Sequence, residues 1–475
     1  MRTPPRLTLL GALALTALAA TTATAGAQEV TVASADRPQP APGDSTPAKK
    51  DSTRTEEKSG VLSAVPVNRI QYMRANDARG INVFETTKRD TVTYRGFELQ
   101  LGGAFTQQFQ GLGHENRAQA RVVNGVNANQ LIQVGHGFNN AVANLYVNAQ
   151  LARGIRVAMT SYLSARHHQE TWVNDGYLQV DASPIDFRPL HTLMRYVTVK
   201  AGHFEINYGD AHFRRTDNGN AMYNPLVGNY VMDAFTTQVG GEVYLRGRGR
   251  LDGAFAMGGV TNGEIRGTTL NAQRRSPGYL TKVGFDRQVS RDLRVRLTGS
   301  SFAQARSANQ TLYSGDRAGS RYYNVVENTT STEKDNFTSG AINPGMNELH
   351  AAVVNPFVKY RGLELFGNFE RARGKAQVDS AARREFTQSA VEGTYRLLDD
   401  RVYVSGRYNT VKGRPANYRA DVTVDRAQLG GGWFINPLIL LKGEWVDQRY
   451  DGFLPTDIRH GARFKGFVVE GVVAF

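Results

Sequence analysis

From residue 94 to its last residue, the chain alternates hydrophobic and polar positions with a period of two. The stretch YRGFELQLGGAFTQQF shows the alternation clearly. Its apolar positions are Phe97, Leu99, Leu101 and Phe105, and its polar positions are Glu98, Gln100 and Thr106. A period of two predicts an extended strand with one apolar face and one polar face.

The same alternation recurs along the rest of the chain and predicts about sixteen strands. They are expected at residues 94–109, 138–151, 154–166, 172–182, 195–206, 233–247, 249–260, 278–290, 292–304, 348–361, 362–373, 385–397, 401–411, 424–436, 438–450 and 461–475.

The connections between these strands alternate between short turns and longer loops. The longer loops are 110–137, 207–232, 261–277 and 305–347, while segments such as ARG after Leu151 are turns of a few residues. Two connections depart from this alternation: residues 183–194 are long where a short turn is expected, and residues 167–171 are short where a long loop is expected. A soluble sandwich would have shorter strands. Long strands in even number predict an all-β transmembrane antiparallel up-and-down β-barrel at residues 94–475.

The chain ends on the strand FKGFVVEGVVAF, whose last residue is Phe475. In an even-stranded barrel with a periplasmic N-terminus, this strand returns to the periplasmic interface, where aromatic residues are enriched. It must pair with the first strand to leave no free edge.

Residues 1–27 are predicted to be a signal peptide. Arg2 and Arg6 precede the apolar run 7–20, and small residues at 25–27 suit cleavage. Residues 28–93 are rich in proline, serine and charge in their first part, which predicts a flexible periplasmic leader with a short ordered piece at 81–87.

The net charge of the chain is +14, and removing Arg2 and Arg6 leaves +12. A basic exported protein points to lipid head groups or anionic solutes rather than to nucleic acid. The chain has no cysteine, which excludes thiolate catalysis and thiolate metal sites.

Catalytic and metal-binding patterns are weak in this sequence. The histidines suited to loops or strand ends lie outside hydrolase and metalloprotease motifs. They are His136, His167, His168, His203, His212 and His350. The RHHQE segment at 166–170 could hold a divalent ion only with strain, because adjacent strand residues point to opposite faces. The glycines at 430–432 precede no helix, so they suit close packing better than phosphate binding. No enzyme activity, metal or cofactor is predicted.

The most distinctive connection lies within AGHFEINYGDAHFRRTDNGNAMYNPLVGNYVMDAFTTQVGGEVYLR, residues 201–246. It follows the fifth strand and is the third connection on the long-loop side. Its charged residues of both signs could fold into a wide barrel and narrow the lumen. These residues are Asp210, Arg214, Arg215 and Asp217.

With its signal peptide, alternating strands, VKAGHFEINYG segment and terminal Phe475, the chain resembles bacterial outer-membrane porins, and more loosely the phosphate-selective porins. The resemblance implies a passive channel, a homotrimer, a constriction by the third loop at Asp210, Arg214, Arg215 and Asp217, and an assembly signal at Phe475. The phosphate-selective members are expected to line the constriction with lysines, whereas this loop has none.

Strand parity independently predicts which charged residues face the lumen. The predicted inward cations are Arg156, Lys200, Arg246, Arg294, Arg296, Arg396, Arg407 and Arg426, and the predicted inward anions are Glu98, Asp175, Asp181, Glu242, Glu364, Glu392, Glu444 and Glu470. The strand wall is therefore nearly balanced in charge.

The sequence leads to an outer-membrane porin for passive diffusion of small hydrophilic solutes, with a weak anion preference drawn from the overall charge. Its expected partners are outer-membrane lipid, lipopolysaccharide and small polar or anionic solutes, in a homotrimer. The alternatives are a structural or adhesive barrel with ligand-binding surface loops and an outer-membrane enzyme with a site at the rim.

Overall fold

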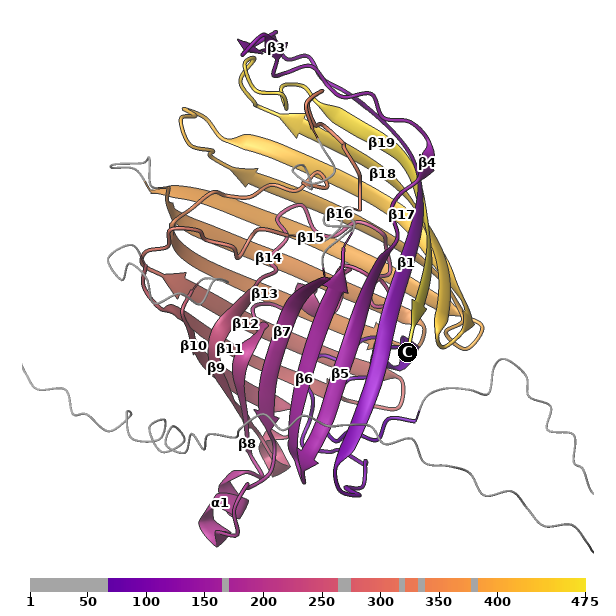
Figure 1. Ribbon diagram of the computed structural model, residues 1–475, viewed down its shortest axis with the longest axis vertical. Coiled ribbons are helices and arrows are strands. Elements are labelled where there is room, and N and C mark those ends of the chain that lie inside the picture. Colours follow the sequence, from indigo (N-terminus) through magenta and orange to yellow (C-terminus); the bar gives the residue numbers. More distant parts are fainter. Residues whose placement is uncertain (1–66, 165–170, 264–274, 316–320, 332–337, 377–382) are drawn as a thin grey trace, which may run out of the picture. The chain divides into compact units, whose positions relative to one another are not determined.

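The computed structural model describes residues 67–164, 171–263, 275–315, 321–331, 338–376 and 383–475. The predicted signal peptide, most of the leader and the RHHQE segment lie outside these residues. Within them, sixteen long antiparallel strands form one closed barrel (Figure 1). The first strand pairs with the last from Ala104–Ala474 to Glu115–Arg463, which closes the wall. The predicted fold class is confirmed.

Each predicted strand has a counterpart in the wall. The wall strands are β1 (Glu98–Glu115), β5 (Val142–Ala152), β6 (Ile155–Leu163), β7 (Thr171–Val180), β8 (Val197–Glu205), β9 (Thr237–Arg246), β10 (Ala254–Thr261), β11 (Gly278–Gln288), β12 (Leu293–Gln304), β13 (Glu348–Tyr360), β14 (Leu363–Lys375), β15 (Arg384–Leu397), β16 (Val402–Gly413), β17 (Val422–Asn436), β18 (Ile439–Asp451) and β19 (Arg463–Ala474).

Short elements lie in the connections of the described chain. The first long loop contains β2 (Val122–Val123), β3 (Val126–Asn127) and β4 (Gly137–Phe138), and α1 (Arg188–Leu193) occupies the connection 183–194 that departed from the predicted order. Three short 3-10 helices are η1 (Ala78–Gly80), η2 (Ala211–Phe213) and η3 (Gly249–Leu251). No helix of the described chain is long and apolar enough to cross a membrane.

Side chains along the wall alternate between exposed and buried, and the apolar ones are often on the exposed side. On β5, Leu145 is 52% exposed while its neighbours Asn144 and Tyr146 are buried. On β14, Leu365 is exposed while Glu364 is 1% exposed. This arrangement is the reverse of a soluble sandwich, in which the apolar faces are buried together.

The alternation of the strands predicted a uniformly polar lumen, but the lumen also contains apolar side chains. Two long connections fold into it, residues 206–236 and the described parts of 305–347, and they bring apolar side chains with them. Val231, Leu312 and Tyr322 pack against wall residues such as Val424 and Phe464 in one buried cluster. The inward apolar residues of the wall therefore have partners inside the barrel.

Residues 67–93 also lie inside the barrel, and we call them the strap. The strap contacts the wall at many points: the Gln71 backbone N–H donates to Gln150 (2.7 Å), and the Asn82 side chain donates to Glu364 (2.7 Å). Phe84 is 3% exposed and packs edge-on against Phe357. Outside the ordered piece expected at 81–87, these contacts differ from the prediction of a flexible leader. The strap lacks a strand-like period because its partners come from several elements.

Phe475 lies at the seam where the barrel closes. Its backbone N–H donates to Gly103 O (2.9 Å) and its carbonyl accepts from Gly103 N–H (3.0 Å), and the residue as a whole is 50% exposed. The resemblance to outer-membrane porins implies that Phe475 is an assembly signal. On that basis we expect deletion of Phe475 to lower the amount of inserted protein far more than it changes the conductance of each inserted channel. Heat-modified mobility on gels measures insertion, and Phe475→Trp is the control. Normal insertion without Phe475 would refute its role as an assembly signal.

Candidate functional site

The connection 206–236, which we call the inward loop, is bound to the inner wall along its length. Its backbone N–H groups donate to wall side chains: Val227 to Glu444, Val231 to Asn409 and Met232 to Gln388, each at 2.7 Å. At Gly219 the loop passes so close to β5 that a Cβ would lie 2.5 Å from Ala143 Cα. These bonds fix the loop within the lumen.

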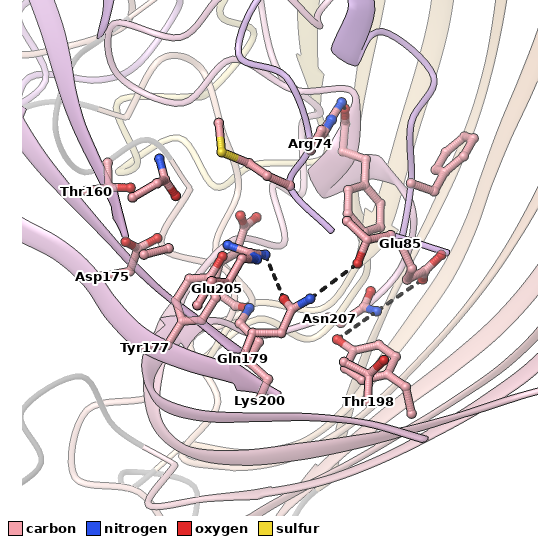
Figure 2. A pocket seen from close by; sticks show the side chains of 18 of the residues that line it. Arg74, Glu85, Thr160, Asp175, Tyr177, Gln179, Thr198, Lys200, Glu205 and Asn207 are labelled. Carbon is pink, nitrogen blue, oxygen red and sulfur yellow. Dashed lines mark hydrogen bonds between the residues drawn. The ribbon is translucent and has the colours of Figure 1, made fainter. Parts of the chain in front are cut away.

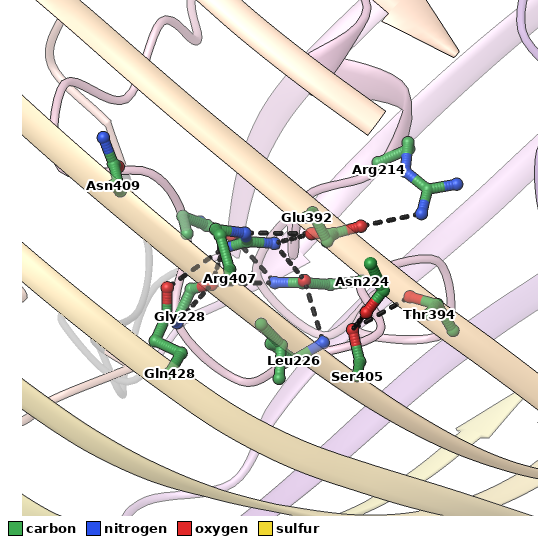
Figure 3. A network of polar contacts seen from close by, with 12 residues as sticks. Arg214, Asn224, Leu226, Gly228, Glu392, Thr394, Ser405, Arg407, Asn409 and Gln428 are labelled. Atoms are coloured by element: carbon green, nitrogen blue, oxygen red, sulfur yellow. Dashed lines mark hydrogen bonds and ion pairs between the residues drawn. The ribbon is translucent and has the colours of Figure 1, made fainter. Parts of the chain in front are cut away.

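A shared carboxylate ties the inward loop to β15 and β16 (Figure 3). Glu392 accepts from Arg214 of the loop at 2.7 Å and from Arg407 of β16 at 2.5 Å. Arg407 also donates to the loop carbonyl of Gly228 (2.8 Å) and to Asn224 (3.1 Å). Two guanidinium groups therefore share one buried carboxylate. Removing it would leave Arg407 without its ion pair and Arg214 with only the longer pair to Glu364 (3.7 Å).

A second group of ion pairs joins the inward loop, the strap and β11–β12. Asp210 pairs with Lys282 and Arg296, each at 2.8 Å, and Glu85 of the strap pairs with the same two cations at 2.8 and 2.7 Å. Deeper in the loop, Arg215 pairs with Asp233 (2.7 Å). The loop and the strap are therefore held by common partners.

The residues predicted to line a constriction are not on a free surface. Asp210, Arg214 and Arg215 are 0%, 2% and 3% exposed and bind the wall or the loop itself. Asp217 accepts a hydrogen bond from Tyr162 of β6. The loop folds inward, but these charges anchor it instead of facing a passage. Sequence spacing could not show which side of the loop meets the wall.

A cavity of about 240 Å³ remains between the strap, the start of the inward loop and the wall strands β5–β9 (Figure 2). Arg156, Gln179 and Lys200 occupy directly paired positions on β6, β7 and β8. Neighbouring strands are about 5 Å apart, so the two cations flank Gln179 in one row across the wall. Arg246 of β9 and Arg74 of the strap also line the cavity.

These four cations differ from those that anchor the loop. Among the described residues, no carboxylate forms an ion pair within 4.0 Å of Arg74, Arg156, Lys200 or Arg246. Arg156 donates to the neutral Gln179 (2.7 Å), and Arg74 lies over the Tyr223 ring at 3.8 Å. Burial lowers the pKa of the Arg74 guanidinium. Arg74 also donates to Gly80 O (2.9 Å) and Phe213 O (3.0 Å), and Lys200 to Glu205 O (3.3 Å). These neutral acceptors leave the positive charge of the four side chains without an ion pair among the described residues.

Most carboxylates near the cavity already have partners. Glu242 is directly opposite Lys200 in the wall, but it is fully buried and accepts from Asn207 N–H (2.9 Å) and Tyr244 OH (2.6 Å). Glu205 pairs with His212 (2.9 Å), and Glu85 with Lys282. Asp175 remains beside the cavity without an ion pair among the described residues. The balance of unpaired charge around the cavity is positive.

The other predicted pore-lining residues lie elsewhere in the barrel. Arg296, Arg407 and Arg426 are 1–3% exposed and bind the inward loop, Arg426 through Asn229 O (2.7 Å). Arg294 pairs with Asp286 (2.7 Å) and lines a second cavity of about 420 Å³ beside the turns 398–401 and 436–437. Of the eight predicted inward cations, the structure brings three, Arg156, Lys200 and Arg246, to the first cavity.

Several charged residues of the lumen were missed at the sequence level. Lys282 and Lys442 are 0% and 2% exposed and face inward, as the two-residue period of β11 and β18 could have shown. Arg74 and Glu85 had no such signal, because the strap is not periodic. Within the described residues there is no cluster of three or more histidine or acidic side chains able to hold a metal.

The outer surface of the wall is apolar on almost every strand. Exposed side chains include Leu145, Val283, Leu365, Trp433 and Phe467, with 44–60% of their surface accessible. In lipid, a closed barrel satisfies all of its backbone hydrogen bonds, and an apolar outer face removes the cost of contact with acyl chains. The protein is an outer-membrane β-barrel.

No family model and no curated protein sequence matches the chain. Similar solved structures include a loop-deleted form of OmpT, an outer-membrane protein of Vibrio cholerae (TM-score 0.47, 11% identity, 80% of this chain and 100% of that one). Others are an anion-selective porin from Comamonas acidovorans (0.47, 11%, 80% and 100%) and OprB of Pseudomonas putida (0.47, 12%, 80% and 94%). The barrel assignment itself depends on the strand pairing and side-chain pattern described above.

The strap should respond to acid through Glu85. Burial raises its pKa, but Arg296 and Lys282 outweigh burial and hold that pKa well below its usual range. A lowered pKa stabilises the bound strap above the ordinary carboxyl pKa, and this contribution is lost as pH falls through the lowered value. We therefore expect the strap to stay bound down to about pH 5, and the conductance to rise under stronger acid as the strap is released.

Glu85→Gln tests this expectation, because it removes the titrating group. The variant should have a raised conductance at neutral pH and a weaker response to acid in planar bilayers. Glu98→Gln is the matched control, since Glu98 binds the strap through the exposed Arg69 (3.2 Å). An unaltered acid response in Glu85→Gln would contradict the role of this carboxylate.

Proposed function

We propose that the protein is a porin that conducts small hydrophilic solutes through the cavity between the strap and β5–β9, with a weak preference for anions. The observation that carries this proposal is the group of four cations beside that cavity, Arg74, Arg156, Lys200 and Arg246, which have no ion-pair partner in the part of the chain that the structure describes. Charged side chains lining a pore set its selectivity. Cations that already bind carboxylates, such as Arg407, add little to the field in the passage.

The long connections support a channel more than an adhesive barrel. An adhesive barrel would present its long loops to the outside, whereas Tyr208, Val227 and Val231 of the inward loop and Leu312 and Tyr322 of 305–347 are at most 4% exposed. Loops that fill part of the lumen narrow it and leave a selective passage.

The proposal includes the partners expected from the sequence: outer-membrane lipid, lipopolysaccharide, small polar or anionic solutes and a homotrimer. Five exposed cations lie near the long-loop ends of β14, β16, β18 and β19, where phosphate groups of lipopolysaccharide would meet the wall. They are Arg371, Arg373, Lys412, Arg449 and Lys465.

Planar-bilayer recording of the purified protein tests the proposal. We expect stepwise conductance and, in a potassium chloride gradient, a reversal potential of the sign that indicates chloride preference. Lys200→Glu should shift this potential toward cation preference, whereas Arg287→Glu on the outer side of β11 should not. A sealed bilayer with correctly folded protein would refute the channel, and a cation-selective wild type would refute the anion preference.

A further inference from the structure

We propose that the cavity between the strap and β5–β9 is a binding site for small aromatic carboxylates. The inference rests on the proposed channel function and names a class of solute that the passage holds during transit. Two features carry it: unpaired cations on the wall side of the cavity and aromatic side chains on the side formed by the strap and the inward loop.

The wall side provides the contacts for a carboxylate. Arg156 is only 5% exposed, yet its Nε has no hydrogen-bond partner among the described residues. The guanidinium of Arg156 and the ammonium of Lys200 lie 5.7 and 4.3 Å from the centre of the same Tyr177 ring. Hydrogen bonds to charged groups are stronger than neutral ones, and a planar guanidinium fits a carboxylate. A carboxylate near Tyr177 would give both cations a charge partner.

The facing side provides apolar contacts. Met73 and Phe84 of the strap and Phe213 of the inward loop line the cavity, together with the Tyr177 and Tyr244 rings of the wall. The Phe84 and Phe213 rings are 5.7 Å apart in an edge-to-face arrangement. Aromatic pairs favour this geometry, and a further ring can add to the cluster in the same way.

The size of the cavity and its mixed lining favour an aromatic acid over an inorganic anion. An enclosed apolar cavity of roughly 150 Å³ holds benzene, so about 240 Å³ leaves room for one ring and a carboxylate. Phosphate would use the cations but would make no apolar contact with Phe84 or Phe213. The ligand that uses both sides joins a negative group to a ring.

Benzoate is the probe for this site. In planar bilayers of the full-length protein with chloride as the carrier, we expect benzoate to reduce the chloride current in a saturable manner. Acetate has the carboxylate without the ring, benzamide has the ring without the charge, and phosphate has the charge alone. Each should require a concentration at least about tenfold higher than benzoate for the same reduction, as expected when one charged or apolar contact is lost.

Two variants separate the two sides of the site. Arg156→Gln should weaken benzoate and acetate together, benzoate by about tenfold. Phe213→Ala should weaken benzoate but leave acetate unchanged, because it removes the ring contact and retains the cations. Arg287→Gln, on the outer side of β11, is the matched control and should behave as the wild type. Circular dichroism and gel mobility verify that each variant is folded.

The outcomes distinguish the site from the channel. Saturable block by benzoate, weakened by both variants as described, supports the site. Normal chloride steps with equal effects of benzoate and phosphate, or with no change in Arg156→Gln and Phe213→Ala, would overturn the site and leave the channel standing. The absence of chloride steps from folded protein would overturn both.

Discussion

Deletion of the strap, residues 67–93, should raise the single-channel conductance severalfold. The strap occupies lumen between the first and second cavities, where Phe84 packs against Phe357 and Glu85 binds Lys282 and Arg296. Its removal leaves the wall closed, because the pairing of β1 with β5 and β19 starts after it. Anion preference should decrease as well, since Arg74 is lost. Planar-bilayer recording measures both quantities.

A deletion of equal length at residues 30–56 is the matched control and should leave conductance unchanged. If the strap deletion lowers insertion, Phe84→Ala gives a second test, because it loosens the strap and leaves the barrel seam intact. Unchanged conductance in both variants would show that the conducting path does not pass the strap.

Glu392→Gln should destabilise the barrel by about 3–5 kcal/mol, the range for breaking a buried ion pair. Glu392 is 1% exposed and is the charge partner that Arg214 and Arg407 share. Glutamine keeps the shape and the hydrogen-bonding oxygen, so the loss of charge is the main change. Urea-induced unfolding in lipid vesicles, followed by tryptophan fluorescence, measures the difference in the free energy of unfolding.

Glu385→Gln is the control on the same strand. Glu385 pairs with Arg371 (2.7 Å), but both side chains are substantially exposed, and exposed pairs contribute little. A loss of stability in Glu392→Gln no larger than in Glu385→Gln would show that the shared carboxylate does not anchor the inward loop.

The wall of this protein was predictable from the sequence because its chemistry has a two-residue period. Leu365 faces out and Glu364 faces in on β14, and the same alternation marked all sixteen strands and the inward direction of Arg156, Lys200 and Arg246. Lipid on one side and polar groups on the other impose this period on each strand independently. The number of strands, and hence a closed barrel, could be predicted by counting the segments that show this alternation.

The interior could not be predicted in the same way, because it depends on contacts between distant segments. Arg214 and Arg215 are adjacent in a loop, and the sequence gives no indication that Arg214 binds Glu392, which is 178 residues away. The strap has no repeating pattern, so Arg74 was assigned to a flexible leader, and Glu85 to a short ordered piece with no predicted partner. These ion pairs between residues far apart in the sequence determine which cations are left without a carboxylate partner.

Single-cysteine labelling tests most directly whether solutes pass along β6–β9 while the opposite side is closed by the inward loop. The chain has no cysteine, so each variant carries one thiol. Lys200→Cys places it beside the first cavity, and Ser405→Cys places it on β16, where Ser405 is 2% exposed. We predict that a charged methanethiosulfonate reagent reduces the current through Lys200→Cys and leaves Ser405→Cys unaffected. Block of Ser405→Cys with no effect on Lys200→Cys would contradict this passage.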